Sequence, residues 1–267
     1  MQAGVRGALS MSVHETAIID PAANIADDVE IGPWSIIGPD VTIGPGCWIG
    51  PHVIITGRTT LGKNNRVYQF NSIGEAPQDM KYAGEDTELI IGDNNLIREF
   101  CTLNRGTVQD GGVTRIGNDN WIMAYVHIAH DCTLGNRIIM GNNASLAGHV
   151  TVGDWAIISG FSQIHQFCDI GAHSFISFNG LVNRSVPPYV TVSAEKSRPR
   201  GVNTEGLRRR GFTPEQIQNV RRAYKVLYRS KLPLEEAREQ LGAMAEDAEE
   251  LQIFIDFIDG HDRSLIR

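Results

Sequence analysis

An aliphatic residue recurs at every sixth position, and this pattern constrains the fold of the chain more than any other feature. The register is unbroken from Val13 to Ile73, resumes from Ile91 to Leu103, and runs again from Ile116 to Val182. A helix would need apolar residues at spacings of three and four, and a plain strand at a spacing of two. A period of six therefore indicates short strands joined by tight corners, with three strands forming one triangular coil of eighteen residues.

The residues around this aliphatic column repeat as well. A glycine often follows it, as at Gly32, Gly44 and Gly141, and a small or β-branched residue stands two positions before it, as at Val41 and Cys47. We expect glycine or a polar residue to bend the chain at each corner. Successive coils would then pair as parallel strands and bury the column between them. The pattern predicts a mainly β fold, a parallel β-helix of hexapeptide repeats.

The register breaks in two places and ends before residue 193. Extra residues between Ile73 and Ile91, and between Leu103 and Ile116, predict loops near 75–88 and 104–115. Excursions of this size from a solenoid usually carry a binding surface. We therefore expect a flexible N-terminal extension at 1–11, a β-helix at 12–192, and a linker with an α-helical C-terminal domain at 193–267. Met11 is a second possible start of translation.

The C-terminal segment follows a helical pattern. Thr213-Pro214-Glu215-Gln216 has the order of a capping box, with threonine as the N-cap and proline in the first turn. A second helix is expected near Pro233, and a third contains Leu251 and Phe254. Their amphipathic faces predict a helical layer that covers the open end of the solenoid.

Composition excludes several classes of protein. No apolar run approaches the roughly 20 residues needed to cross a bilayer, so membrane insertion is not expected. The four cysteines, Cys47, Cys101, Cys132 and Cys168, form no C-x-x-C pair. Without such a pair or an export signal, we expect four buried thiols in a reducing cytoplasm.

Positive charge is concentrated in one segment. The whole chain has a net charge of −7, yet residues 196–231 contain eleven Lys and Arg against two acidic residues. Such a segment is either a solvated helix face or a docking patch for an acidic group, such as a nucleotide diphosphate, a nucleic acid or an acidic protein. The tyrosines of this segment, Tyr224 and Tyr228, lie on an apolar stripe and cannot stack on bases. We therefore expect no nucleic-acid partner.

Three histidines are placed close to one edge of the predicted prism. Positions eighteen apart lie above one another, and His149 and His165 each miss the register of His130 by one residue. Three histidines suggest either a metal site, as in metal-dependent hydratases with a similar repeat, or general base catalysis. The spacing does not match the arrangement of ligands in those hydratases. We expect no metal.

General base catalysis has further support from neighbouring residues. Asp131 could fix the tautomer of His130 and stabilise its imidazolium form, provided that the chain turns between them. The backbone N–H of Gly148 could stabilise an oxyanion. Together these groups predict acyl transfer to a hydroxyl or an amine, with no serine or cysteine nucleophile.

Several longer motifs also favour an acyltransferase. The segments IGPW, DMKYAGE, RGTVQ, HIAHDC, NNASLAGHV, HQFC, VPPYV and EGLRRRGF occur along nearly the whole chain. With them the sequence resembles the UDP-N-acetylglucosamine 3-O-acyltransferase family, whose reaction is the first step of lipid A biosynthesis. The resemblance implies a left-handed β-helix and a homotrimer with active sites between neighbouring chains. It also implies a 3-hydroxyacyl donor carried on the phosphopantetheine of acyl carrier protein, and no cofactor.

The resemblance implies roles for individual residues. His130 would be the general base, Asp131 its partner and Gly148 the oxyanion donor. His127, His149 and His165 would position the substrate, and Asp79 and Lys81 would contact the sugar. The nucleotide would be held by Gln166, Asn203, Glu205, Arg209 and Arg210, with the arginines on its phosphates. Two positions depart from the family pattern. Asn104 stands where the family often has histidine. Phe178 occupies the position that ends the acyl groove, and its bulk predicts a short acyl chain.

Other functions remain open at this point. The chain could act on a UDP-sugar with a 3-amino group, because the same base and oxyanion donor would serve either nucleophile. It could be the related N-acyltransferase of the same pathway, although that family normally has an added N-terminal domain. It could also be a solenoid that binds acyl carrier protein without catalysis.

Overall fold

The computed structural model of the protein describes residues 12–194, 197–260 and 265–266. The chain forms two compact units, Met1–Cys132 and Thr133–Arg267. The expected N-terminal extension, residues 1–11, lies outside the described residues. The boundary expected at residue 192 stays a prediction about domain organisation.

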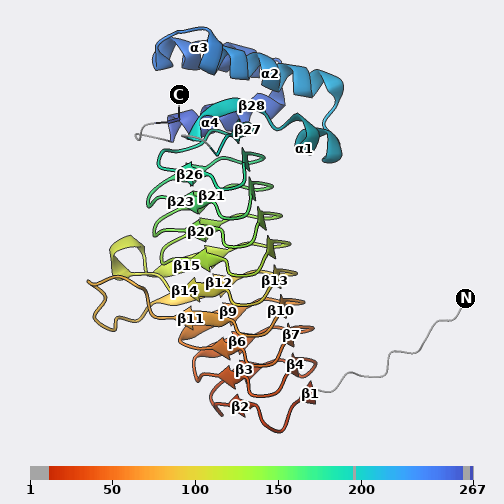
Figure 1. Ribbon diagram of the computed structural model, residues 1–267, viewed down its shortest axis with the longest axis vertical. Coiled ribbons are helices and arrows are strands. Elements are labelled where there is room, and N and C mark those ends of the chain that lie inside the picture. Colours follow the sequence, from red (N-terminus) through yellow and green to blue (C-terminus); the bar gives the residue numbers. More distant parts are fainter. Residues whose placement is uncertain (1–11, 195–196, 261–264, 267) are drawn as a thin grey trace, which may run out of the picture. The chain divides into compact units, whose positions relative to one another are not determined.

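The N-terminal unit consists of short strands in three parallel sheets (Figure 1). The first sheet contains β1 (Ser12–Val13), β4 (Glu30–Ile31), β7 (Trp48–Ile49), β10 (Arg66–Val67), β13 (Leu96–Ile97) and β16 (Trp121–Ile122). The second contains β2 (Ile18–Ile19), β5 (Ile36–Ile37), β8 (Ile54–Ile55), β11 (Ser72–Glu75), β14 (Thr102–Asn104) and β17 (His127–Ile128). The third contains β3 (Asn24–Ile25), β6 (Val41–Ile43), β9 (Arg58–Leu61), β12 (Glu88–Ile91) and β15 (Val113–Ile116).

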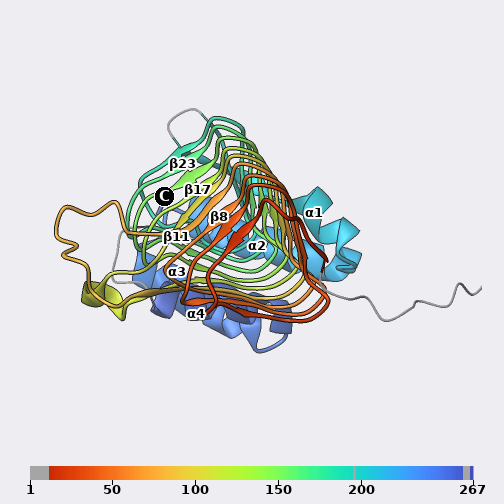
Figure 2. The ribbon, with the colours of Figure 1, turned by 90° about the horizontal axis from the view of Figure 1, so that it is seen from below.

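The aliphatic column forms the core, as the period of six predicts. Ile31 pairs with Ile49, one coil further along the chain, and Ile37 pairs with Ile55. From Ile31 to Val182 every residue of the column is at most 3% exposed. Val13, by contrast, is 37% exposed because it belongs to the first described coil, which has a neighbour on one side only. Seen from below, the coils of the N-terminal unit are triangular (Figure 2).

The glycines after the column have a different role from the one expected. Gly32 and Gly44 have ordinary φ values, but a Cβ atom on either would lie 2.7–2.8 Å from the backbone of the next coil. They are needed because the coils approach closely. The turns are made by other residues with left-handed φ angles between 55° and 63°, among them Trp34, His52 and Tyr125.

These corner residues form a continuous ring stack. The ring centroids of Trp34, His52, Phe70, Phe100 and Tyr125 follow one another at 4.8–5.2 Å. A left-handed φ is unfavourable for a bulky side chain. Ring stacking and backbone hydrogen bonds, such as the one from the His52 N–H to the Pro33 carbonyl at 2.9 Å, offset this cost.

Both irregular segments of the N-terminal unit lie where the register breaks. The first connects β11 to β12, and the second connects β14 to β15 and contains a 3-10 helix, η1 (Val108–Asp110). Both project from one side of the coils (Figure 2).

The C-terminal unit continues the same type of coil. Its sheets contain β19 (Ile139–Met140), β22 (Ile157–Ile158), β25 (Phe175–Ile176) and β27 (Val190–Val192); β20 (Ser145–Leu146), β23 (Gln163–Ile164) and β26 (Leu181–Val182); and β18 (Thr133–Leu134), β21 (Thr151–Val152) and β24 (Asp169–Ile170). A further strand, β28 (Pro199–Val202), pairs antiparallel with β27 and ends the parallel arrangement.

Helices follow β28: α1 (Thr204–Arg209), α2 (Pro214–Arg229), α3 (Leu234–Ala245), the 3-10 helix η3 (Glu249–Leu251) and α4 (Gln252–Asp259). The predicted capping box is present, with Thr213 accepting from the Gln216 N–H. The expected linker contains regular structure, β28 and α1. The hydroxyl of Tyr189 donates to the Glu250 carbonyl at 2.6 Å, which attaches the helices to the last coil. None of the helices in the described ranges is long and apolar enough to cross a membrane.

Candidate active site

His130 and Asp131 form a hydrogen-bonded pair just after β17. Asp131 has a left-handed φ of 60°, and this turn brings two sequence neighbours to the same side. His130 Nδ1 lies 2.8 Å from Asp131 Oδ2, and the two side chains are 13% and 1% exposed. Because the carboxylate accepts from Nδ1–H, Nε2 is the basic nitrogen of the neutral His130 ring. The predicted turn between the two residues is therefore present, and it fixes the orientation of the histidine ring.

The carboxylate of Asp131 also organises the second loop. It accepts from the Thr107 N–H at 2.7 Å and from the Thr107 hydroxyl at 2.6 Å. The backbone N–H of Asp131 donates to Thr114 Oγ1 at 2.8 Å. These donors satisfy the oxygens of a carboxylate that is almost completely buried. The three contacts hold His130 in a fixed position.

His127 lies on β17 in the same coil as His130. Its Nδ1 is 2.7 Å from the Thr102 hydroxyl on β14. Burial lowers the pKa of His127, and the charge of His130 lowers this pKa further. His127 is therefore suited to act as a neutral hydrogen-bonding group beside His130.

Asn104 anchors the first loop. Its Nδ2 donates to the carbonyls of Glu75 and Ala76, at 3.3 and 2.8 Å, where that loop begins. The loop contains Asp79, whose carboxylate accepts from the backbone N–H of Lys81 at 2.9 Å. The asparagine that replaces the family's histidine thus positions the segment expected to meet the sugar.

Gly148, His149 and His165 lie in the C-terminal unit. Gly148 is buried, and its carbonyl accepts from the Phe167 N–H at 3.1 Å. The ring of His149 stacks on Phe167 with centroids 4.3 Å apart. His165 is exposed, and its Nδ1 donates to the Gln166 carbonyl at 3.2 Å. The approach of these residues to His130 stays a prediction.

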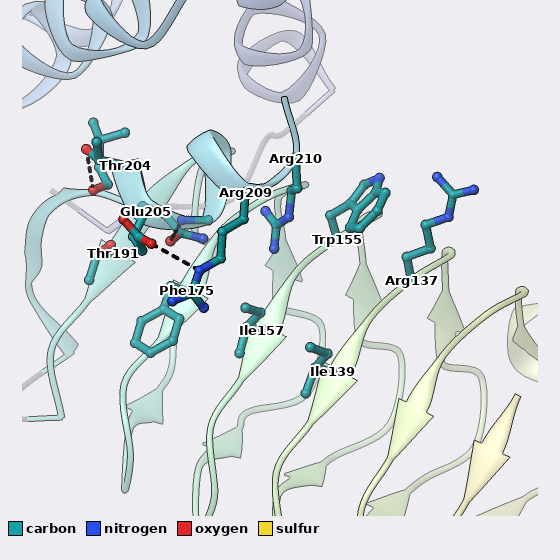
Figure 3. Close-up of a pocket in the computed structure, with 13 residues that line it drawn as sticks. Arg137, Ile139, Trp155, Ile157, Phe175, Thr191, Thr204, Glu205, Arg209 and Arg210 are labelled. Carbon is teal, nitrogen blue, oxygen red and sulfur yellow. Dashed lines mark hydrogen bonds and ion pairs between the residues drawn. The ribbon is translucent and has the colours of Figure 1, made fainter. Parts of the chain in front are cut away.

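A pocket of about 590 Å³ in the C-terminal unit brings together the residues expected to bind the nucleotide. Its lining includes Asn203, Glu205, Arg209 and Arg210 (Figure 3). Glu205 pairs with Arg209 at 3.0 Å, and Arg210 is half-buried. Gln166 does not line this pocket; it borders a separate hollow of about 430 Å³ together with His165.

Sequence reasoning missed two residues of this pocket, Arg137 and Trp155. The Arg137 guanidinium lies 4.8 Å from the centroid of the Trp155 ring, and that of Arg210 lies 5.3 Å from it. Figure 3 shows the tryptophan between the two arginines. The two positions are eighteen residues apart, so coil register was a signal that could have linked them.

Phe178 is 62% exposed and packs edge-to-face against Phe161, with centroids 5.5 Å apart. Two exposed rings in contact make a bulky apolar obstacle. This arrangement is compatible with a residue that ends an acyl groove, and its role stays a prediction.

Comparison with known proteins identifies the family. The profile described as UDP N-acetylglucosamine O-acyltransferase, domain 2, matches residues 186–266, and that of the bacterial transferase hexapeptide matches residues 114–148. Acyl-(acyl-carrier-protein)–UDP-N-acetylglucosamine O-acyltransferase from Thiobacillus denitrificans is 56% identical, covering 96% of this chain and 99% of its own length. The protein of the same name from Stenotrophomonas maltophilia is 54% identical, covering 96% of this chain and 97% of its own length.

Solved structures agree with the sequence comparison. UDP-N-acetylglucosamine acyltransferase from Francisella novicida has a TM-score of 0.94 and 45% identity, with 96% of this chain and 94% of that chain covered. The O-acyltransferase from Moraxella catarrhalis has a TM-score of 0.93 and 46% identity, with 96% and 99% covered. The fold is thus a left-handed parallel β-helix of hexapeptide repeats with C-terminal helices, as predicted. The chain belongs to the UDP-N-acetylglucosamine O-acyltransferase family.

Proposed function

We propose that this protein transfers a 3-hydroxyacyl chain from acyl carrier protein to the 3-hydroxyl of UDP-N-acetylglucosamine, the first step of lipid A biosynthesis. The observation that carries the proposal is the His130–Asp131 pair, a buried carboxylate 2.8 Å from the Nδ1 of a half-buried histidine. The two substrates are inferred from the family to which the chain belongs and from the names of the relatives.

The reaction requires one base and one oxyanion donor. Nε2 of His130 takes the proton of the sugar 3-hydroxyl as that oxygen attacks the thioester carbonyl. A C–O bond forms, and the N–H of Gly148 stabilises the tetrahedral oxyanion. When the intermediate collapses, the C–S bond breaks and the imidazolium returns its proton to the departing phosphopantetheine thiolate. Asp131 stabilises the imidazolium between these steps.

The remaining residues bind the substrates in this proposal. Arg209 and Arg210 hold the diphosphate, and Asn203 and Glu205 hold the nucleoside, because all four line one pocket. Asp79 and Lys81 contact the sugar, and His127, His149 and His165 position the substrate. Gln166 contacts the nucleotide from outside this pocket. The basic face of α2, which includes Arg221 and Lys225, receives the acidic acyl carrier protein.

We further propose a homotrimer in the cytoplasm, as the resemblance implies. The four cysteines are buried and form no disulfide with one another, which is compatible with a reducing compartment. Sedimentation equilibrium measures the oligomeric state directly.

Product analysis tests the proposed reaction. Purified protein is given UDP-N-acetylglucosamine or its 3-amino analogue, each with a series of 3-hydroxyacyl carrier proteins, and products are identified by mass. We expect a single ester product on the 3-hydroxyl sugar. An amide product in preference to the ester would move the assignment to the 3-amino substrate, and no acyl product with either sugar would refute acyl transfer.

A further inference from the structure

Four side chains on successive coils of the C-terminal unit form a continuous stack beside the nucleotide pocket. The Arg137 guanidinium lies over the Trp155 ring at 4.8 Å. The Trp155 ring is nearly parallel to that of His173, with centroids 6.3 Å apart, and His173 stacks on Tyr189 at 5.4 Å. Phe212 contacts the edge of the stack, 5.3 Å from His173. His173 is therefore held on both faces and at one side.

Arg210 reaches into this stack. Its Nη1 lies 3.1 Å from His173 Nδ1, and its guanidinium lies 5.3 Å from the Trp155 ring centroid. Glu205 forms ion pairs with Arg208 and Arg209. Among the described residues, no carboxylate forms an ion pair with Arg210. Burial lowers the pKa of the Arg210 guanidinium. A half-buried cation without an acidic partner is suited to bind an anionic group of a ligand.

The main chain of His173 holds a second pocket residue. Its carbonyl accepts from Asn203 Nδ2 at 2.9 Å. The Oδ1 atom of Asn203 in turn accepts from the Gly206 N–H at 3.2 Å and caps α1. His173 therefore contacts both ends of the short segment that contains Asn203, Glu205, Arg209 and Arg210.

We infer that His173 is a positioning residue for the nucleotide pocket: its Nδ1 accepts from Arg210 and aims the guanidinium at the diphosphate of the substrate. A guanidinium can only donate hydrogen bonds, so this contact requires an unprotonated Nδ1. The inference rests on the proposed function, because it takes the anion to be the diphosphate of the UDP-sugar.

The electrostatic surroundings keep His173 in the required state. Burial and, to a lesser degree, the charge of Arg210 together lower the pKa of His173 to about 4, against the opposing effect of Asp154. The imidazole therefore stays neutral at physiological pH, and the contact with Arg210 does not change there.

Equilibrium binding of UDP and of uridine tests the inference. His173→Phe keeps an aromatic ring in the stack but removes the acceptor, and His173→Asn places an amide oxygen close to the position of Nδ1. We expect His173→Phe to weaken UDP binding roughly tenfold, the size of one lost hydrogen bond to a charged group, and to leave uridine binding unchanged. His173→Asn restores most of the UDP affinity, and it carries the test if the phenylalanine variant does not fold.

A double-mutant cycle separates positioning from a structural role. If His173 acts through Arg210, then His173→Phe has no further effect on UDP affinity in an Arg210→Gln background. Equal loss of UDP and uridine affinity in His173→Phe, or losses that add in the double variant, would overturn the inference. The inference would also be overturned if His173→Asn bound UDP as weakly as we expect for His173→Phe, which has no acceptor.

His52 provides a matched control. It stacks between Trp34 and Phe70 at 5.0 and 5.2 Å, on a corner of the N-terminal unit. His52→Phe therefore repeats the same substitution in a similar stack, and we expect it to leave UDP affinity unchanged. Acyl transfer by the wild-type protein is measured separately. A protein that binds UDP through His173 and Arg210 but forms no acyl sugar would refute the proposed reaction and leave this inference standing.

Discussion

At the scale of single residues, the site depends on a few buried polar contacts. Asp131 accepts hydrogen bonds from His130 and from two groups of Thr107. One carboxylate thus fixes the tautomer of His130 and the position of the second loop. Asn104 has the corresponding role for the first loop through the carbonyls of Glu75 and Ala76. A conservative substitution of Asp131 or Asn104 would therefore also displace loop residues that are not in contact with it.

Phe178 is expected to limit the length of the acyl chain. Its exposed ring packs against Phe161, and Phe178→Gly removes this bulk from the groove proposed for the donor. We expect the preferred 3-hydroxyacyl donor to shift toward longer chains, measured as kcat/KM over a series of carrier proteins. Phe100 also has an exposed ring, but it lies on a corner of the N-terminal unit. Phe100→Gly therefore serves as the control and should leave the preference for chain length unchanged. An unaltered preference in Phe178→Gly would contradict the assignment.

Two half-buried histidines, His127 and His173, predict a pH dependence of stability. The folded-state pKa of His173 is about 4, below the ordinary histidine value of 6.5, and that of His127 is also lowered. The unfolded chain therefore binds more protons in this range, so stability is complete above pH 6.5 and is lost as the pH falls toward 4. Each proton contributes at most about 1.4 kcal/mol per pH unit, and partial exposure reduces this slope.

Urea unfolding between pH 5 and 7 measures this effect. The free energy of unfolding of the wild-type protein should fall more steeply with decreasing pH than that of His173→Phe, which cannot take up the proton. Identical pH dependence in the two proteins would show that His173 does not titrate differently on folding.

At the scale of elements, the coil depends on close backbone approach and on residues that accept a left-handed φ. A period of six predicted which aliphatic residues are buried, since that burial requires only the register. The period did not predict that Trp34, His52, Phe70, Phe100 and Tyr125 would stack at the corners. Intrinsic propensity disfavours bulky residues with positive φ, and here contacts between coils override that propensity.

Gly44 tests the role assigned to the glycines. A Cβ at this position would lie 2.8 Å from the carbonyl group of Gly62 in the next coil. Gly44→Ala should therefore lower the free energy of unfolding by about 1–3 kcal/mol, as overpacking does elsewhere. Gly242 in α3 has open space around it, and Gly242→Ala should raise stability by up to about 1 kcal/mol. Similar effects of the two substitutions in urea unfolding would argue against close approach as the reason for glycine.

At the scale of the whole molecule, the sequence predicted the repeat, the core and the change to helices. It could not predict α1, because a six-residue helix with a glycine inside has little periodicity. It also placed Gln166 with the nucleotide residues, whereas this residue lines a different hollow. The stack around His173 was not found because its members are distributed over four coils and share only their register. Contacts between coils determine the stack around His173 and the position of Gln166, and these contacts cannot be predicted from hydrophobic periodicity.

On a repetitive β-helix, we propose, one histidine acts as the general base for acyl transfer. Single-turnover transfer by His130→Ala, compared with the wild type at saturating UDP-N-acetylglucosamine, tests this role. We expect a rate about 10²–10⁴ lower, with UDP affinity retained, because proton transfer is lost while the nucleotide pocket is intact. An undiminished rate in folded His130→Ala would show that the pair formed with Asp131 is not the catalytic base.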